Sequence, residues 1–434
     1  MKVESISNLL ILLILIVLSG CSTREAMTES SRAQRSGPPL PENSFTIQAQ
    51  KFPGEEFRSI QIFSGTNPGT APIIKPSSGE MLTLRFDHLS NNSDMFTVRA
   101  EHRNSDWSAS NLFDGFYMRG QLTDYISDPV QSTSVAPNYM QYTYRFPNRN
   151  FSFQISGNYL LHIEDYRTGD LLFSVPFMLY EDQGSIETAI EEVYGLESYH
   201  FLHHQPFATY ILPEFVLMPD QDISIYFVQN QFWGRLQQAT IRDISESDRI
   251  RMHVPRDDAF PGRYEFMPLI MQDIDDLPTD FIEVRKDTEP PAVVRDRDVI
   301  NFRVNPSNLG SNRYGRPETR QDARYARVEF VLDRPVNLGT DSRIYVTGPF
   351  SNWGVSDNNR MRYNPESDQF TASILIKEGS YDYKYVLVEG RFIDDLRLAD
   401  SFADSRQEYY TLVYYRDLQL NADRLLNISS DITR

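Results

Sequence analysis

Three of the seven histidines lie in one short stretch, His200-Phe201-Leu202-His203-His204. On a helix, positions i, i+3 and i+4 share one face, so the three imidazoles could act together as metal ligands. No neighbouring pattern of histidine or acidic residues completes a recognisable site, and Gln205-Pro206 follows directly. The sequence therefore favours a packing or surface cluster here, with a metal site as the alternative.

Two other segments carry clustered carboxylates, DISESDRIR (243–251) and MQDIDDLPTD (271–280). Oxygen ligands of this kind can bind Ca²⁺, but neither segment has the spacing of the twelve-residue calcium loop. We therefore expect both segments to be solvated loops.

The sequence contains no catalytic motif. It has no nucleophile elbow, no H-E-x-x-H zinc motif, no phosphate-binding loop and no dinucleotide fingerprint. Acidic residues are so common that no pair of them can be singled out as the two carboxylates of a glycosidase. We predict a protein that is not an enzyme and that has no catalytic residue, no cofactor and no metal ligand. The net charge of −18 also argues against nucleic-acid binding.

The amino terminus reads MKVESISNLLILLILIVLSGC, a short apolar run followed by small residues and a cysteine. Such a run is typical of a secretory signal and is shorter than a membrane-spanning helix. Its end resembles a bacterial lipobox, which implies cleavage before Cys21 and acylation of that residue; the alternative is an ordinary signal peptide or signal anchor. Cys21 is the only cysteine, so no disulfide is expected within the chain.

The remaining sequence has the composition of an all-β protein. Aromatic residues make up 12%, and short runs rich in Val, Ile, Tyr and Phe alternate with turn-forming clusters. Several runs, such as MLTLRFDHL and YDYKYVLV, suit half-buried antiparallel strands. The segment IETAIEEVYG (186–195) is one candidate for helical periodicity. We predict tandem β-sandwiches of immunoglobulin or early-set type.

The expected domains follow from changes in composition along the chain. Residues 22–44 are polar and Pro-rich, so they suit a flexible tether between a membrane anchor and the folded part. We expect these segments: 1–20 signal peptide, 21–44 lipidated tether, 45–183 first β-sandwich, 184–287 second β domain, 288–324 interdomain connection, 325–419 early-set-like sandwich and 420–434 tail.

The stretch FTVRAEHRNSDW (96–107) and the residues after it resemble the amino-terminal domain of the type IX secretion system plug protein family of Bacteroidetes. This chain has Arg103 and Ser105 where that family often has cysteine and alanine. The positions that match the family's motifs in this part of the chain are His102, Asn104, Asp106, Trp107, Tyr117, Gly120, Asp124, Tyr125, Pro147, Asn148, Gly157, Asn158 and Tyr159.

A second group of residues resembles the carboxyl-terminal module of the same family and also glycogen-binding sandwiches. Its segments are GPFSNWG (348–354) and GSYDYKYVLVEG (379–390). The matching positions are Gly348, Phe350, Asn352, Trp353, Gly379, Tyr381 and Tyr383.

Each motif residue type also has an ordinary structural role. Gly120 and Gly157 suit turns that need a positive φ. Asp106, Asn148 and Asn352 are of the type that accepts a hydrogen bond from the backbone two residues further on. For Trp107 and Trp353 we favour core packing over contact with a partner or a sugar.

The resemblance implies a non-enzymatic plug subunit, held at the outer membrane by acyl chains on Cys21 and facing the periplasm. Its implied partner is the outer-membrane translocon barrel of the type IX secretion system, whose periplasmic mouth it would close. The alternative is a glycan-binding envelope lipoprotein that uses the carboxyl-terminal sandwich. A third possibility is an envelope scaffold without translocon contact.

Overall fold

The computed structural model describes residues 40–134, 136–193, 203–262, 266–300, 313–335, 338–339, 341–398 and 407–433. The predicted signal peptide, the lipidation site Cys21, most of the predicted tether and His200 lie outside these residues. Within this part of the chain, no helix is long and apolar enough to cross a bilayer.

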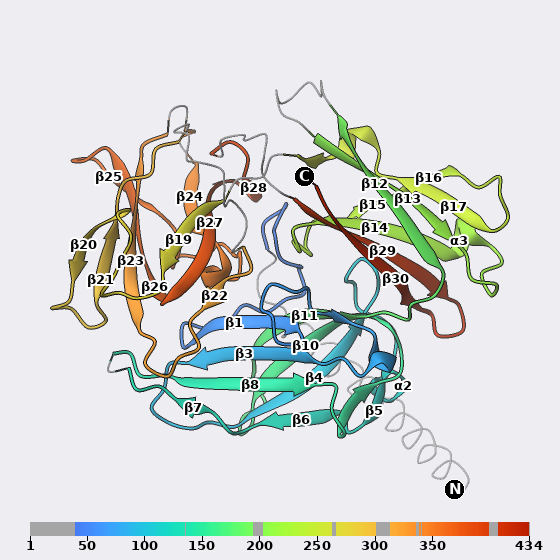
Figure 1. Cartoon of the computed structure of the whole chain (residues 1–434), viewed down its shortest axis with the longest axis horizontal. Coiled ribbons are helices and arrows are strands. Elements are labelled where there is room, and N and C mark those ends of the chain that lie inside the picture. The colour runs from blue at the N-terminus through green and yellow to red at the C-terminus, as the bar shows by residue number, and fades with distance from the viewer. Residues whose placement is uncertain are drawn as a thin grey trace, which may run out of the picture. The chain divides into compact units, whose positions relative to one another are not determined.

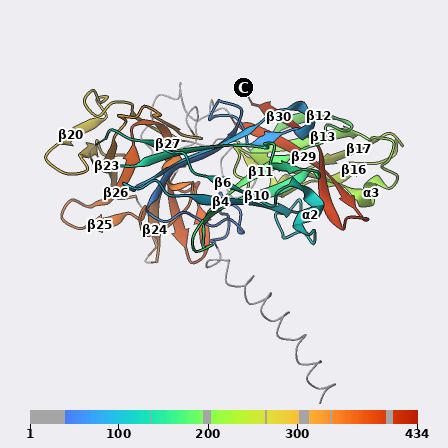
Figure 2. The same cartoon turned by 90° about the horizontal axis from the view of Figure 1, so that it is seen from below.

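The first β-sandwich is built from two sheets that enclose an aromatic-rich core (Figure 1). Figure 2 shows β6, β4, β10 and β11 side by side in one of them. The first sheet has the order β1 (Phe57–Ser64), β3 (Leu82–His88), β8 (Met140–Phe146) and β7 (Val130–Gln131). The second has the order β2 (Ile73–Ile74), β11 (Leu171–Leu179), β10 (Gly157–Asp165), β4 (Phe96–Arg103) and β6 (Thr123–Ile126).

Short elements complete this sandwich. The one-turn helix α2 (Asp114–Tyr117) leads into β5 (Met118–Gly120), which forms a small antiparallel pair with β9 (Phe151–Phe153). The 3₁₀ turn η1 spans Pro76–Ser78.

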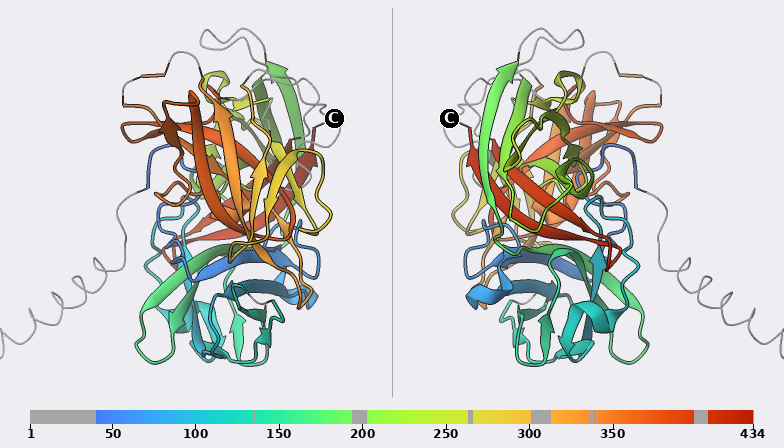
Figure 3. Two further views of the ribbon diagram at one scale, coloured as in Figure 1. Left: turned by 90° about the vertical axis from the view of Figure 1, so that its left-hand side faces the viewer. Right: turned by 90° about the vertical axis from the view of Figure 1, so that its right-hand side faces the viewer.

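The second sandwich combines strands from the middle of the chain with the last two strands. One sheet has β12 (Ser185–Val193), β13 (His203–Ile211), β17 (Arg249–His253) and β16 (Thr240–Asp243), with β18 (Phe260–Pro261) on β13. The other has β15 (Gln237–Gln238), β14 (Ile223–Gln229), β29 (Glu408–Asp417) and β30 (Ala422–Ile432). Helix α3 (Pro219–Asp222) and the turn η2 (Arg256–Asp258) lie in its connections. Figure 3 shows the red carboxyl-terminal strands alongside the green strands of this sandwich.

The third sandwich is formed by two further sheets around a separate core. One sheet has β19 (Met267–Met271), β27 (Gly379–Glu389) and β22 (Arg316–Pro317), with β24 (Arg343–Thr347) and β28 (Phe392–Asp394) also paired to β27. The other has β20 (Phe281–Arg285), β21 (Ala292–Arg295), β23 (Tyr325–Asp333), β26 (Gln369–Lys377) and β25 (Arg362–Asn364). The turn η4 spans Pro349–Ser351. The predicted tandem all-β sandwich fold is thereby confirmed.

The segment 186–195 differs from its expected helical character. Its described part belongs to strand β12, where Ile186, Thr188 and Ile190 are partly buried and the residues between them are exposed. This period of two matches a strand with one covered face, and the nine-residue pairing with β13 stabilises it. The apolar spacing of four that suggested a helix is equally compatible with alternate positions of a strand.

The strand pairing also divides the chain differently from the expected segments. Residues 420–434, expected to be a polar tail, contain β30, which pairs with β29 along its length. β29 in turn pairs with β14, so the chain end belongs to the second sandwich and not to the third. Strands β19 and β20 lie within 184–287 but pair with strands of the third sandwich. Pairing partners far apart in sequence decide this division, and local composition does not reveal them.

Candidate functional site

The first group of motif residues gathers where β4 and β10 of the first sandwich meet the second sandwich. His102 is buried, and its Nε2–H donates a hydrogen bond to the carbonyl of Ser156 at 3.1 Å. Its ring packs edge-on against Tyr159 at 5.0 Å. Gly157 has a φ of 139°, and a Cβ there would lie 2.5 Å from His102 Nε2 and 3.1 Å from the carbonyl of Asp423 in β30. The glycine therefore allows the two sandwiches to approach closely.

A network of polar contacts, which we call the Asn158 junction, joins the two sandwiches here. It consists of Asn158, Tyr414, Ser105 and Asp423. Tyr414 in β29 donates to Asn158 Oδ1 at 2.7 Å, and Asn158 Nδ2 donates to the carbonyl of Asn104 at 3.0 Å. The backbone N–H and the hydroxyl of Ser105 both donate to Asp423 Oδ2, at 3.0 and 2.7 Å. Ser105, a departure from the family pattern, thus contributes two bonds to the junction.

Trp107 completes this junction with apolar contacts. Its side chain is 5% exposed and belongs to a cluster with Leu160 and Met178 of the first sandwich and Leu412 and Leu425 of the second. The backbone φ of 66° is unusual for a bulky residue and occurs in the turn that Asp106 stabilises by accepting a bond from the N–H two residues on. The favoured core role of Trp107 therefore agrees with the structure.

The other early motif residues form a corner of the first sandwich. Asp124 accepts hydrogen bonds from the Tyr144 hydroxyl and from Asn148 Nδ2, both at 2.8 Å. Asn148 Oδ1 accepts the N–H of Asn150 at 2.9 Å, as expected for its residue type. Gly120 has a φ of 93° and faces the carbonyl of Asn150 so closely that a Cβ would lie 2.5 Å away.

The segment around this corner exposes large apolar side chains, which we call the 113–125 surface. It consists of Phe113, Phe116, Leu122 and Tyr125, with exposed fractions of 76%, 58%, 46% and 48%. The Phe113 and Phe116 rings lie 6.4 Å apart, whereas Tyr117 beside them is buried and donates to the carbonyl of Ala100. Several exposed aromatic side chains within one short stretch of chain are typical of an interaction surface.

Trp353 of the second motif group lies in an aromatic cluster. Its ring is 5.5 Å from Phe45, 5.2 Å from Phe232 and 5.5 Å from Phe266. Its Nε1–H donates to the carbonyl of Arg313 at 3.0 Å. This tryptophan holds together segments from four parts of the chain, which agrees with the favoured packing role.

The remaining positions of this motif group serve the turn η4 and the core of the third sandwich. Asn352 has a left-handed φ of 50° and ends the turn, instead of accepting the side-chain bond expected for its residue type. Tyr381 and Tyr383 are buried, and the Tyr383 hydroxyl donates to Asp298 at 2.6 Å. The other positions are Gly348 at the start of the turn, Phe350 within it and Gly379 at the start of β27.

The polar clusters considered for metal binding are engaged in other contacts. His203 and His204 are consecutive residues of strand β13, not of a helix, and His204 Nδ1 lies 2.8 Å from the Tyr409 hydroxyl. Asp243 pairs with Arg251 at 2.7 Å. Among the described residues, no group of three or more His, Cys, Asp or Glu side chains is placed to hold a metal ion.

A second buried polar network, the Asp87 junction, was not anticipated from the sequence. It consists of Asp87 in β3 of the first sandwich and Lys377, Tyr325 and Tyr139 around it. Lys377 Nζ lies 2.8 Å from Asp87 Oδ2, and both side chains are 1% exposed. The Tyr325 hydroxyl donates to the same oxygen at 2.7 Å, and Lys377 lies over the Tyr139 ring at 4.2 Å. Burial lowers the pKa of Lys377, and the attraction of Asp87 opposes this shift.

The candidate functional residues that the sequence analysis missed carry only weak signals in the sequence. Asp87 and Lys377 are charged residues near the ends of mostly apolar strand patterns, in MLTLRFDHL and FTASILIK. Phe113 and Phe116 lie outside any strand-like alternation in the sequence. Only their exposure in the folded protein marks them, and the sequence does not show exposure.

The fold and these junctions define a tandem β-sandwich protein with several exposed apolar side chains on its first sandwich. Residues 57–181 match the family described as Type 9 secretion system plug protein 1st domain. The chain therefore carries the first domain of the type IX secretion plug family, and the resemblance drawn from the sequence is confirmed over these residues. This match connects the chain with the type IX secretion components of the bacterial envelope, and a plug-family domain of this fold is not typical of enzymes.

Similarity to solved structures supports the fold of nearly the whole chain. A crystal structure of a hypothetical protein from Parabacteroides merdae ATCC 43184 has a TM-score of 0.79 and 21% identity, covering 88% of this chain and 99% of that one. The carboxyl-terminal domain of the Streptococcus pyogenes antigen I/II-family protein AspA reaches a TM-score of only 0.13 at 8% identity, covering 86% and 99%, which supports no conclusion. The search of curated proteins gave no match.

Proposed function

We propose that this protein is a non-enzymatic plug subunit that binds the outer-membrane translocon of the type IX secretion system and closes its periplasmic mouth. The observation that carries the proposal is the match of residues 57–181 to the plug family's first domain. A plug acts by filling and contacting a pore, so it needs a firm body and a contact surface instead of catalytic groups.

The rigid body is provided by the contacts between sandwiches. The Asn158 junction attaches the first sandwich to the second, and the Asp87 junction attaches it to the third. The buried hydrogen bonds of these junctions resist the relative movement of the sandwiches. Breaking any one of these bonds would leave a buried polar group unpaired, which costs free energy. A plug that deformed easily could not exclude water and ions from a wide channel.

The contact surface in this proposal includes the 113–125 surface, which lies within the family-matched residues. A lasting seal between two proteins buries at least about 1,000 Å² and concentrates its binding energy in large aromatic side chains. Phe113 and Phe116 are the most exposed aromatic side chains of that surface. Acyl chains on Cys21 would raise the effective concentration of the plug at its membrane-embedded partner.

The proposal is tested by co-purification from native envelopes. We expect the tagged protein to recover the large outer-membrane barrel, and the variant Phe113→Asp/Phe116→Asp to recover much less, because charges replace the apolar contact. The matched control is Leu217→Asp in the second sandwich, where the native side chain is 83% exposed. Recovery of intact protein without any large outer-membrane partner would contradict the proposal.

The lipid anchor is tested separately. A Cys21→Ala variant at native expression should occupy the barrel less than the wild type does, since it loses the membrane-bound tether. Equal occupancy would show that the anchor contributes nothing to binding. The glycan-binding alternative is not favoured by any observation, because Trp353 is packed in its aromatic cluster and its N–H is already bonded.

A further inference from the structure

A hollow of about 850 Å³ opens in the third sandwich where the chain passes from one sheet to the other. Met361 N–H donates to the carbonyl of Ile344 in β24 at 2.8 Å. The next residue, Arg362, already pairs with Thr371 of the opposite sheet. The hollow is therefore formed at an opening between the two sheets, and its size is typical of ligand sites.

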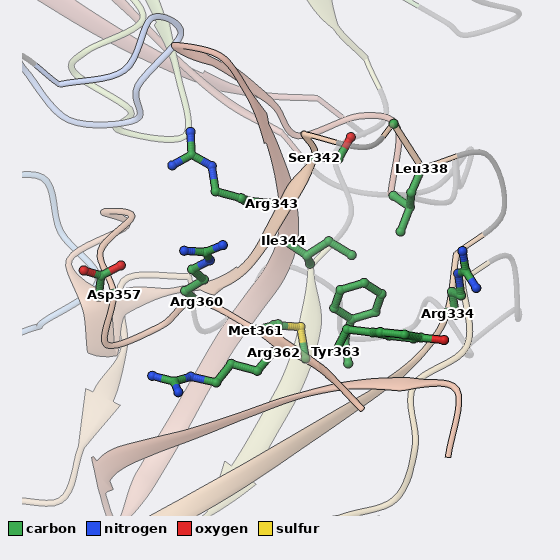
Figure 4. Close-up of a pocket in the computed structure, with 12 residues that line it drawn as sticks. Arg334, Leu338, Ser342, Arg343, Ile344, Asp357, Arg360, Met361, Arg362 and Tyr363 are labelled. Atoms are coloured by element: carbon green, nitrogen blue, oxygen red, sulfur yellow. The ribbon is translucent and has the colours of Figure 1, made fainter. Parts of the chain in front are cut away.

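Four arginines line this hollow in a protein whose net charge is −18. In the view of Figure 4, Arg343, Arg360 and Arg362 lie on one side and Arg334 on the other. Asp357 is the only acidic residue among the described lining residues. Arg343, Arg360 and Arg362 form no ion pair with any carboxylate in the described part of the chain. Their charges are therefore available to an anionic ligand.

The remaining lining side chains are mostly apolar. Ile344 and Met361 are buried and lie between the arginines in Figure 4. The Tyr363 ring is 42% exposed and is tilted by 46° to the ring of Phe370. Arg334 lies over the Tyr363 ring at 5.4 Å. The hollow thus combines positive charge with an apolar floor.

The strand that borders the hollow has a free edge. β25 is the last strand of its sheet and pairs only with β26 among the described strands. Arginine on an edge strand can simply prevent unwanted pairing. That role does not account for Arg334, which follows the internal strand β23. The charges of three different segments converge on one hollow.

We propose that this hollow binds an acidic, extended polypeptide segment of a partner protein. The guanidinium groups would hold carboxylates in paired hydrogen bonds, the floor would take an apolar side chain between them, and the free edge of β25 would pair with the peptide backbone. This site lies outside residues 57–181 and is independent of the proposed closure of the translocon.

Other anionic partners fit the hollow less well. A bilayer with anionic headgroups would be repelled by the strong overall negative charge of the protein and offers no backbone to pair with β25. An acidic glycan would need a flat aromatic platform, whereas Tyr363 and Phe370 are tilted and Arg334 covers one of them. Both remain outcomes that the experiment distinguishes.

The experiment measures fluorescence anisotropy of a labelled peptide in which glutamate alternates with phenylalanine and leucine, titrated with the full chain. We expect saturable binding that weakens with added salt. The variant Arg360→Gln/Arg362→Gln should bind roughly tenfold more weakly or worse, because each lost charge-assisted pair removes a strong contact. A peptide with glutamine in place of glutamate should not bind.

The matched control is Arg249→Gln/Arg251→Gln, which removes two charges from β17 of the second sandwich, where both arginines are ion-paired. It should bind the acidic peptide as the wild type does. Equal binding by the Arg360/Arg362 variant would overturn the proposal. A second outcome would also overturn it. In that outcome the wild type does not bind the peptide but binds phosphatidylglycerol vesicles or polygalacturonate, and only the Arg360/Arg362 variant loses that binding. The assay contains no translocon, so its failure leaves the proposed plug function to its own test.

Discussion

The two junctions described above both attach the first sandwich to the rest of the described chain, and they differ in chemistry. The Asp87 junction centres on a fully buried ion pair between Asp87 and Lys377. The Asn158 junction relies on a neutral amide that exchanges hydrogen bonds with Tyr414 and with backbone carbonyls, with the carboxylate of Asp423 at its edge. A buried charge depends entirely on its partner, whereas a neutral network can lose one bond and keep the others.

This difference predicts how each junction fails. In the Asp87 junction, removal of one charge leaves the other without compensation in a dry environment. In the Asn158 junction, the cost should rise stepwise with the number of bonds removed. Substitutions matched in burial can therefore separate the two kinds of attachment.

The largest effect is expected for Lys377→Met, which keeps an unbranched side chain one heavy atom shorter and removes its charge. Asp87 would remain buried without its cation, so the free energy of unfolding should fall by about 3–5 kcal/mol. Urea unfolding measures this change. The double variant Lys377→Met/Asp87→Asn keeps an acceptor for Tyr325 and should recover most of the loss. A single variant as stable as the double one would contradict a charge-dependent junction.

A smaller effect is expected for Asn158→Leu. This change leaves the carbonyl of Asn104 and the hydroxyl of Tyr414 without their buried partner, at a cost of about 2–3 kcal/mol in unfolding free energy. Tyr414→Phe removes only one of these bonds and should cost about 1 kcal/mol. Urea unfolding measures both changes. An equal loss of unfolding free energy in the two variants would contradict the stepwise cost, because the bonds of the Asn158 junction would then be lost as one unit.

The sequence revealed strands much better than their partners. The runs MLTLRFDHL and YDYKYVLV identified β3 and β27, but the expectation of half-buried strands was wrong, because β27 is covered on both faces and β3 is buried at most of its positions. The pattern could not show that residues 422–432 form a strand of the second sandwich, because the pattern of a strand carries no information about which strand pairs with it. The predicted tail failed for this reason, whereas the candidate helix at 186–195 failed because its apolar spacing of four also fits alternate positions of a strand.

The candidate site was predicted in the same partial way. The resemblance identified Asn158, but the partner that explains its role lies far along the chain: Tyr414 bonds Asn158 across 256 positions. Ser105 was noted only as a departure from the family pattern, yet it bonds Asp423 across 318 positions. The exposure of Phe113 and the convergence of arginines on the hollow are properties of the folded surface. Neither follows from residue spacing.

The third prediction uses pH to test the Asn158 junction while its four residues stay unchanged. His102 lies beside this junction, and burial lowers its pKa to about 4, while the bond to Ser156 and the charge of Asp423 oppose the shift. The unfolded chain therefore binds this proton at higher pH than the folded one, so the stability contributed by the neutral ring is complete above about pH 6.5 and is lost as the pH falls towards 4.

Between pH 7 and pH 5 the free energy of unfolding should therefore fall by about 2 kcal/mol from His102 alone. The control is His102→Gln, whose amide can still donate to Ser156 but does not titrate. Glu101 does not interfere in this window: burial raises its pKa, but bonding to His162 and the charge of Arg103 outweigh that and lower it to about 2. His162 titrates in both proteins, so the difference between their slopes isolates His102. Equal slopes for the wild type and His102→Gln would show that the ring can be charged in place, and that the contact between β4 and the second sandwich is looser than its geometry indicates.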